Sequence, residues 1–219
     1  MPTVWDDNLA CPRETFVTHL ECSMTGERHE ADRLHGLSRA GWPLLVRYDL
    51  EGARRSLSRE ALAGRPMDLW RYRELLPVRH AGNIAALGET ATPIVALRAS
   101  GKRLGLDTLL VKDEGRLPTG SFKARGLALA VSMAKELGVE KIAMPTNGNA
   151  GAALAAYGSR AGIETIVLCP EDTPEINVRE IAARGARVYR VNGLIDDCGK
   201  IVAEGARQGE WFDLSTLKE

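Results

Sequence analysis

Gly120-Ser121-Phe122-Lys123-Ala124-Arg125-Gly126 is the stretch that decides how this 219-residue chain is interpreted. It follows an apolar segment, Leu109–Val111, that predicts a strand, and it opens an apolar pattern typical of an amphipathic helix over Phe122–Leu137. Ser121 is the expected N-cap, because its hydroxyl can accept a hydrogen bond from an N–H group of the first turn. The pattern therefore places Lys123 at the start of a helix, just after a strand.

Lys123 is a candidate nucleophile. The positive end of a helix dipole favours the uncharged form of an amine, and only that form has a lone pair that can attack a carbonyl. One alternative is an ordinary solvated lysine. Another is a nucleotide-binding loop, because Gly115–Gly120 fits the first six positions of G-x-x-x-x-G-K-[ST]. The lysine comes two positions too late for that motif, so we reject the nucleotide-binding interpretation.

Composition and charge exclude several function classes. With 29 basic and 29 acidic residues, the net charge of zero gives no electrostatic case for nucleic acid or an anionic membrane. No apolar run approaches the roughly 20 residues that span a bilayer, and Met1–Asp7 lacks the order of a signal peptide. The cysteines form no C-x-x-C pair, which predicts a cytoplasmic protein with reduced thiols. They are Cys11, Cys22, Cys169 and Cys198.

Strand and helix patterns alternate from Leu106 onward, which predicts an α/β fold with a parallel sheet and helices on both faces. The expected strands are Leu109–Val111, Ile142–Met144, Thr165–Cys169, Arg187–Val191 and Trp211–Asp213. The expected helices are Phe122–Leu137, Ala150–Ala161, Glu175–Ala183 and Leu194–Arg207. The earlier residues are irregular, apart from a strand at Leu44–Tyr48 and a helix at Met67–Leu76 that Pro77 would end.

A second polar turn, Pro145–Gly151, follows the strand at Ile142–Met144 and opens the next helix. Ligands of open α/β sheets bind at the carboxyl ends of strands. Asparagine and glycine are also common at helix starts for local reasons alone, so this turn by itself is equally compatible with a simple cap. Together with Lys123, it predicts a cleft suited to a flat aldehyde cofactor that bears a hydroxyl group. The polar or flexible positions of the turn are Thr146, Asn147, Gly148 and Asn149.

Both motifs resemble the threonine synthase family, which belongs to the fold type II group of pyridoxal-phosphate enzymes. Val111–Lys123 is similar to the family's cofactor-lysine segment, and Thr146–Gly151 with Leu154–Tyr157 is similar to its asparagine loop and the helix that follows. The resemblance extends from about residue 44 to residue 219. Two further segments that match are Trp70–Pro77 and Leu87–Pro93.

The resemblance implies a reaction and a site. Lys123 would be the Schiff-base lysine that binds pyridoxal 5'-phosphate and shuttles protons at Cα and Cβ of the substrate. Phe122 would help to wall the cofactor ring, and Asn149 would hydrogen-bond its 3-hydroxyl. The implied reaction converts the small amino-acid substrate O-phospho-L-homoserine and water to L-threonine and phosphate. Further candidates, for the substrate's carboxylate or phosphate, are Thr146, Asn147 and Gly148.

The resemblance also implies a domain organisation. Residues 1–65 would form an irregular, cysteine-poor ribbon-like segment, residues 66–138 part of the large cofactor domain, and residues 139–219 a truncated small α/β domain. The chain would be the N-terminal half of the enzyme, since no two of its 22 glycines are adjacent, whereas the family places a glycine run in its second half. Asp213–Glu219 resembles the point just before a substrate-phosphate segment. The full-length enzyme could be a homodimer.

No metal is expected. Family members often carry a cysteine-rich ribbon, and here Cys22 stands alone where a pair would be needed; His29 and His35 are expected on the solvated surface. Two other functions stay open. One is a different fold type II enzyme, either a threonine or serine dehydratase, which Trp70–Pro77 disfavours, or an enzyme like cysteate synthase. The other is a non-catalytic fragment that binds a ligand or a partner chain.

Overall fold

The structure is a computed structural model that describes residues 14–215. Cys11, the Met1–Asp7 segment and the last four residues of the Asp213–Glu219 segment lie outside this range. The described strands are β1 (Val17–Cys22), β2 (Arg28–His29), β3 (Leu44–Tyr48), β4 (Ile94–Ala96), β5 (Leu110–Lys112), β6 (Lys141–Pro145), β7 (Glu164–Pro170), β8 (Arg187–Val191) and β9 (Phe212–Asp213).

The described α-helices are α1 (Leu50–Ser56), α2 (Arg59–Ala63), α3 (Arg98–Leu104), α4 (Lys123–Glu136), α5 (Asn149–Ala161), α6 (Glu175–Ala183) and α7 (Ile195–Arg207). Short 3₁₀ helices cover Leu69–Leu75, Ala81–Asn83 and Glu114–Arg116. None of the helices within residues 14–215 has both the length and the apolar character needed to cross a membrane.

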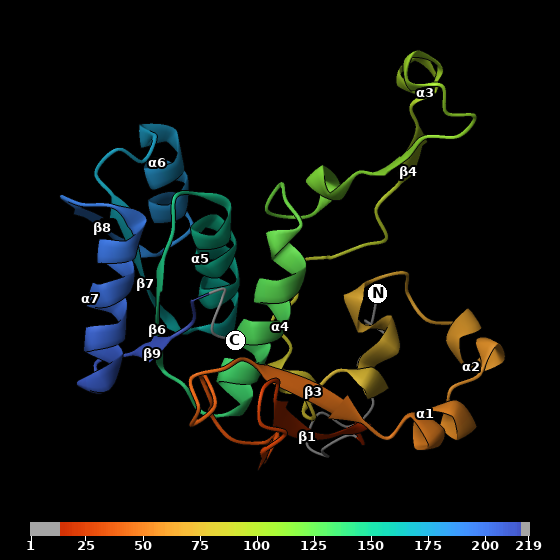
Figure 1. Cartoon of the computed structure of the whole chain (residues 1–219), viewed down its shortest axis with the longest axis horizontal. Helices are drawn as coiled ribbons and strands as arrows, with labels where there is room; N and C mark the ends of the chain where they lie inside the picture. The colour runs from red at the N-terminus through yellow and green to blue at the C-terminus, as the bar shows by residue number, and fades with distance from the viewer. Residues whose placement is uncertain (1–13, 216–219) are drawn as a thin grey trace.

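A four-stranded parallel sheet in the order β8-β7-β6-β9 forms the C-terminal part of the structure. Helices α5 and α6 cover one face and α7 covers the other (Figure 1). Side chains alternate between these faces along each strand: Ile142 and Met144 join the core under α5, while Ala143 joins the core under α7. The α/β fold predicted from the sequence is confirmed, and from β6 onward the element ends agree to within one residue.

The strand order contains a reversal beside β6. The chain runs outward from β6 through β7 to β8, and it then returns through α7 to place β9 on the other side of β6. The connections on the two sides of β6 therefore run in opposite directions and separate at its carboxyl end. In open α/β sheets this switch point is where ligands bind.

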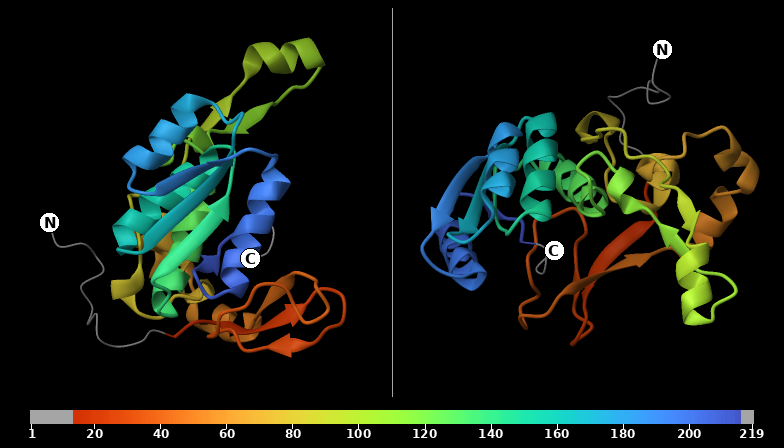
Figure 2. Two further views of the ribbon diagram at one scale, coloured as in Figure 1. Left: turned by 90° about the vertical axis from the view of Figure 1, so that its left-hand side faces the viewer. Right: turned by 90° about the horizontal axis from the view of Figure 1, so that it is seen from above.

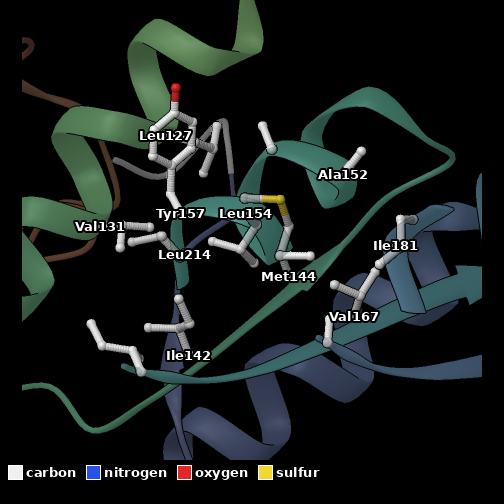
Figure 3. Close-up of a cluster of buried hydrophobic side chains, with 14 of the residues drawn as sticks. Leu127, Val131, Ile142, Met144, Ala152, Leu154, Tyr157, Val167, Ile181 and Leu214 are labelled. Atoms are coloured by element: carbon white, nitrogen blue, oxygen red, sulfur yellow. The ribbon is translucent and has the colours of Figure 1, made fainter. Parts of the chain in front are cut away.

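Helix α4 packs against α5, which itself lies on the sheet. Small residues allow both contacts. Ala124 and Ala128 of α4 are completely buried where α4 meets the core. In α5, a Cβ atom on Gly151 would lie only 3.1 Å from Val167 Cγ1 of β7, so glycine lets α5 lie close to the sheet. The depth of this packing fixes where α4 begins relative to the sheet. Figure 3 shows the cluster, which includes Leu127, Val131, Ile142, Met144, Leu154, Tyr157, Val167 and Leu214.

A buried hydrogen bond ties the N-terminal part of the chain to α5. The hydroxyl of Tyr157, which is completely buried, donates to Oε1 of Glu89, and the backbone N–H of Leu87 donates to the same oxygen at 2.9 Å. Burial first and the Glu89 carboxylate second raise the pKa of Tyr157. The segments Leu87–Pro93 and Leu154–Tyr157, noted separately in the sequence, therefore meet in the core.

Strands β1, β2 and β3 form a small antiparallel sheet in the order β2-β1-β3, which lies beside the lower end of α4 in Figure 1. Cys22 is buried here, and its thiol hydrogen-bonds Ser38 Oγ at 3.1 Å and accepts from the Thr25 N–H at 3.4 Å. These two partners stabilise the thiolate and lower the pKa of Cys22 to about 7. No group of three or more His, Cys, Asp or Glu residues within 14–215 is arranged to hold a metal ion.

Several local expectations were wrong. The side chain of His29 is only 11% exposed, and its ring meets that of His35 edge-on at 5.3 Å, so His29 is not a solvated residue. The α-helix predicted over Met67–Leu76 is a 3₁₀ helix over Leu69–Leu75, and it is kinked because the backbone leaves helical angles at Tyr72 (φ −108°, ψ 39°).

Strand β5 was expected in the parallel sheet, and instead it pairs antiparallel with β4. All six residues of this two-stranded sheet are exposed, and the β4–β5 hairpin with α3 projects from the rest of the chain (Figures 1 and 2). Within residues 14–215, no third strand pairs with either edge of this sheet. Uncovered apolar strands of this kind promote association between molecules.

We expect the double substitution Val95→Thr/Val111→Thr to reduce self-association, measured by light scattering against protein concentration. Threonine keeps the β-branched shape that strands favour, so each substitution should change the free energy of unfolding by less than about 0.5 kcal/mol. The control is Ile176→Thr, because Ile176 is 72% exposed on α6 rather than on the hairpin. Equal self-association of the hairpin variant and the control variant would show that molecules do not associate through the hairpin.

Candidate active site

Lys123 and the turn after β6 line one polar pocket of about 460 Å³. Lys123 is the first residue of α4, whereas the turn joins β6 to α5 at the switch point of the sheet. The structure therefore brings together the two motifs that the sequence singled out. The residues that line this pocket are Lys123, Pro145, Thr146, Asn147, Gly148, Asn149, Ala150, Asn177 and Ile195.

Thr146 holds the turn from the inside. Its side chain is buried, and its Oγ1 accepts hydrogen bonds from the backbone N–H groups of Gly148 and Gly151, both at 3.2 Å. A hydroxyl that closes a turn in this way replaces the backbone hydrogen bond of a tight turn. The two asparagines of the turn, Asn147 and Asn149, are exposed and line the pocket.

Phe122 does not line the polar pocket. It lines a second pocket of about 340 Å³, which is largely apolar and also includes Lys123, Met144 and Leu214. Phe122 is 60% exposed, and the centroid of its ring lies 5.1 Å from the Nζ atom of Lys123, within the range of a cation–π contact. Lys123 thus stands between a polar pocket on one side and an apolar pocket on the other.

Ser121 is not the N-cap of α4. Phe122 occupies that position with helical backbone angles, and no side chain caps it. The first N–H groups are satisfied by the backbone instead: Ala124 N–H donates to Ser121 O at 3.2 Å and Arg125 N–H donates to Phe122 O at 3.1 Å. The Ser121 Oγ atom is buried and has no hydrogen-bond partner within the described residues.

A charged cluster fixes the start of α4 to the β4–β5 hairpin. Arg125 donates from Nε to Glu114 Oε2 at 2.6 Å and from Nη2 to Oε1 at 3.1 Å, while Lys112 and Thr92 also hydrogen-bond Glu114 Oε1. The two cations and the hydroxyl lower the pKa of Glu114 well below its ordinary value, with Arg125 as the largest cause. Arg125 follows Lys123 by two residues, so the cluster restrains the backbone that carries the candidate nucleophile.

Sequence reasoning missed Asn177 and Ile195 as pocket residues. They come from the first turns of α6 and α7, which reach the switch point only through the sheet topology, so no local signal could have identified them. Glu114 lies in the Val111–Lys123 segment and Arg125 lies in the Gly120–Gly126 segment. Their opposite charges on either side of Lys123 could have indicated an ion pair.

We expect Glu114→Gln to lower the free energy of unfolding at pH 7. The variant should also lose the part of the pH dependence of that free energy that comes from titration of Glu114. The folded-state pKa of Glu114 is depressed, so its stabilisation is present above the unfolded pKa of about 4.3 and declines as pH falls. The difference in free energy of unfolding between wild type and variant, measured with urea, should therefore shrink steadily below about pH 4. Glu171→Gln, at an exposed residue, is the control. A difference that stays constant from pH 7 to pH 3 would contradict the assignment.

Comparisons with known proteins agree with this geometry. A family model described as "Pyridoxal-phosphate dependent enzyme" matches residues 85–218. A threonine synthase of Methanocaldococcus jannaschii is 37% identical over 197 residues, which cover 90% of this chain and 49% of that protein. A threonine synthase of Methanosarcina acetivorans is 32% identical over 201 residues, which cover 91% of this chain and 49% of that protein. This chain thus spans about half the length of these relatives.

Solved structures share the fold. The apo form of Escherichia coli diaminopropionate ammonia lyase superposes with a TM-score of 0.55 at 22% identity, covering 61% of this chain and 42% of that one. A pyridoxal 5'-phosphate-dependent aspartate racemase superposes with a TM-score of 0.52 at 25% identity, covering 57% and 40%. The expected resemblance to fold type II enzymes and to threonine synthases is confirmed. The match to residues 85–218 establishes that this chain belongs to the family of pyridoxal-phosphate-dependent enzymes.

Proposed function

We propose that this chain contributes the cofactor-lysine half of a threonine synthase, which converts O-phospho-L-homoserine and water to L-threonine and phosphate. The observation that carries the proposal is the single polar pocket shared by Lys123 and the turn at Thr146–Asn149, located at the switch point of the sheet. The threonine synthases that match 90% and 91% of this chain favour this reaction over others of the family.

The pocket residues support binding of the aldehyde and the ring hydroxyl of pyridoxal 5'-phosphate. An aldehyde needs an amine within reach, and a ring hydroxyl needs a polar partner; Lys123 and the Asn149 amide line the same pocket and would supply these two groups. When bound, the cofactor supplies an electron sink for carbanion chemistry. The apolar pocket beside Phe122 offers a wall for a flat ring.

The roles of the protein groups follow from their positions. Lys123 would hold the cofactor through its Nζ atom and then carry protons at Cα and Cβ of the substrate. Asn149 would hydrogen-bond the 3-hydroxyl and orient the ring. The exposed Asn147 amide and the start of α5 would bind the substrate's carboxylate or phosphate, because helix N-termini favour anions. Orientation and proton transfer are thus the protein's contribution.

The direct test is chemical trapping. The purified chain is incubated with pyridoxal 5'-phosphate, reduced with borohydride and mapped by peptide mass spectrometry. We expect a pyridoxyl group on Lys123, and we expect Lys123→Ala to lose it, while Lys141→Ala, at a partly buried lysine on β6, retains it. Modification spread over other lysines, or none, would contradict cofactor binding and favour a non-catalytic fragment.

Product analysis then identifies the reaction. Threonine released from O-phospho-L-homoserine supports the proposal, whereas 2-oxobutanoate released from threonine would indicate a dehydratase, and turnover of O-phosphoserine with sulfite would indicate a cysteate synthase-like enzyme. Loss of the proton shuttle in Lys123→Ala should lower the rate by about 10²- to 10⁴-fold. Full activity of that variant would rule out all three enzymatic assignments.

A further inference from the structure

Asn177 of α6 contacts the turn after β6 from outside the sheet. Its side-chain Nδ2 donates a hydrogen bond to the backbone carbonyl of Asn147 at 3.0 Å, across thirty positions of sequence, and Asn177 lines the same pocket as Lys123. The connection between the amide and the turn is direct, so α6 can influence the pocket without touching Lys123.

The peptide unit between Asn147 and Gly148 is held at both ends. Asn177 binds its carbonyl oxygen, and Thr146 Oγ1 accepts a hydrogen bond from its N–H at 3.2 Å. In a trans peptide these two groups point in opposite directions from one rigid plane. The plane therefore cannot rotate without breaking both hydrogen bonds.

The Asn177 amide lies close to Gly148. A Cβ atom at position 148 would lie 2.9 Å from Asn177 Nδ2 and 3.4 Å from Asn177 Cγ. The amide is at the flexible end of its side chain, so an alanine would displace it and break its bond to Asn147. Substitution at either position should thus release the same peptide.

Helix α6 provides a fixed base for this contact. Ile181 follows Asn177 by four residues, on the same face of the helix, and is completely buried in the main core. The Cδ1 atom of Ile181 would lie 3.0 Å from a Cβ atom on Gly151, the residue whose N–H also donates to Thr146. The core contact of α6 therefore sets the position of the Asn177 amide.

We propose that Asn177 is a positioning residue that prevents rotation of the Asn147–Gly148 peptide and so keeps Asn149 directed at the cofactor held by Lys123. The effect on the cofactor rests on the proposed function. The restraint on the Asn147–Gly148 peptide, called the clamp below, rests only on the hydrogen bonds from Asn177 and to Thr146. If the peptide rotated, its carbonyl would replace its N–H on the Thr146 side, and the backbone at Gly148, the residue before Asn149, would lose the hydrogen bond that holds it.

The first measurement needs no cofactor. Backbone amide exchange at residue 148, corrected for intrinsic rate, should rise about 2- to 10-fold in Asn177→Ala, as expected for loss of one modest hydrogen bond. Gly148→Ala should raise it similarly, and the double variant should exceed neither single variant, because both release one contact. Unchanged exchange in Asn177→Ala, or additive effects in the double variant, would overturn the clamp.

The second measurement follows the absorption spectrum and affinity of bound pyridoxal 5'-phosphate. We expect Asn177→Ala and Asn177→Asp to change the ratio of the cofactor bands and to weaken affinity about 2- to 10-fold. Ile176→Ala, at the exposed neighbouring residue, should match wild type in every readout. A wild-type spectrum despite faster exchange would refute the positioning role. If wild type binds no cofactor, the proposed function fails, and the exchange experiment alone decides the clamp.

Discussion

The parallel pairing of β6 with β7 on one side and β9 on the other is the constraint on which the candidate site depends. Ile142 pairs with Thr165 of β7 and with Phe212 of β9, so β6 is an interior strand whose polar turn cannot move away from the sheet. The strand order reverses at this position, and Asn147 and Asn149 are exposed at the carboxyl end of β6. A fixed yet accessible turn is the arrangement that a cofactor site needs.

The second half of the site depends on helix packing rather than on strand pairing. Lys123 reaches the pocket only because α4 lies close against α5, and alanines at positions 124 and 128 make that approach possible. A larger side chain at either position would move the start of α4 and carry Lys123 with it. The distance between amine and asparagine turn is thus set by side chains that have no chemistry of their own.

The sequence predicted the parallel sheet well and its surroundings less well. From Lys141 onward each strand and helix carries a clear periodicity, and these elements were predicted almost to the residue. β5 was misplaced because its partner β4 is only three residues long, and strand pairing is not a local property. Ser121 failed as a cap because the chain already enters α4 with helical backbone angles, so backbone carbonyls take the first N–H groups.

The site was predicted as two motifs, without the groups that position them. Lys123 and the turn at Thr146–Asn149 were recognisable by residue type, while Asn177 looks like any asparagine in the first turn of a helix. Its relation to Asn147 arises only when β7 and α6 bring distant residues together. The residues that would contact a cofactor were therefore predictable from the sequence, whereas the residue that positions them, Asn177, was not.

The charged cluster at Glu114 has a consequence for local unfolding. The β4–β5 hairpin and α3 contribute almost nothing to the main cores, so their native conformation can be lost while the parallel sheet stays intact. Arg125 and Glu114 lie at the boundary between these two units. Each opening of the hairpin would separate that ion pair and loosen the first turn of α4, so unfolding of this solvent-exposed hairpin would be transmitted to the amine of Lys123.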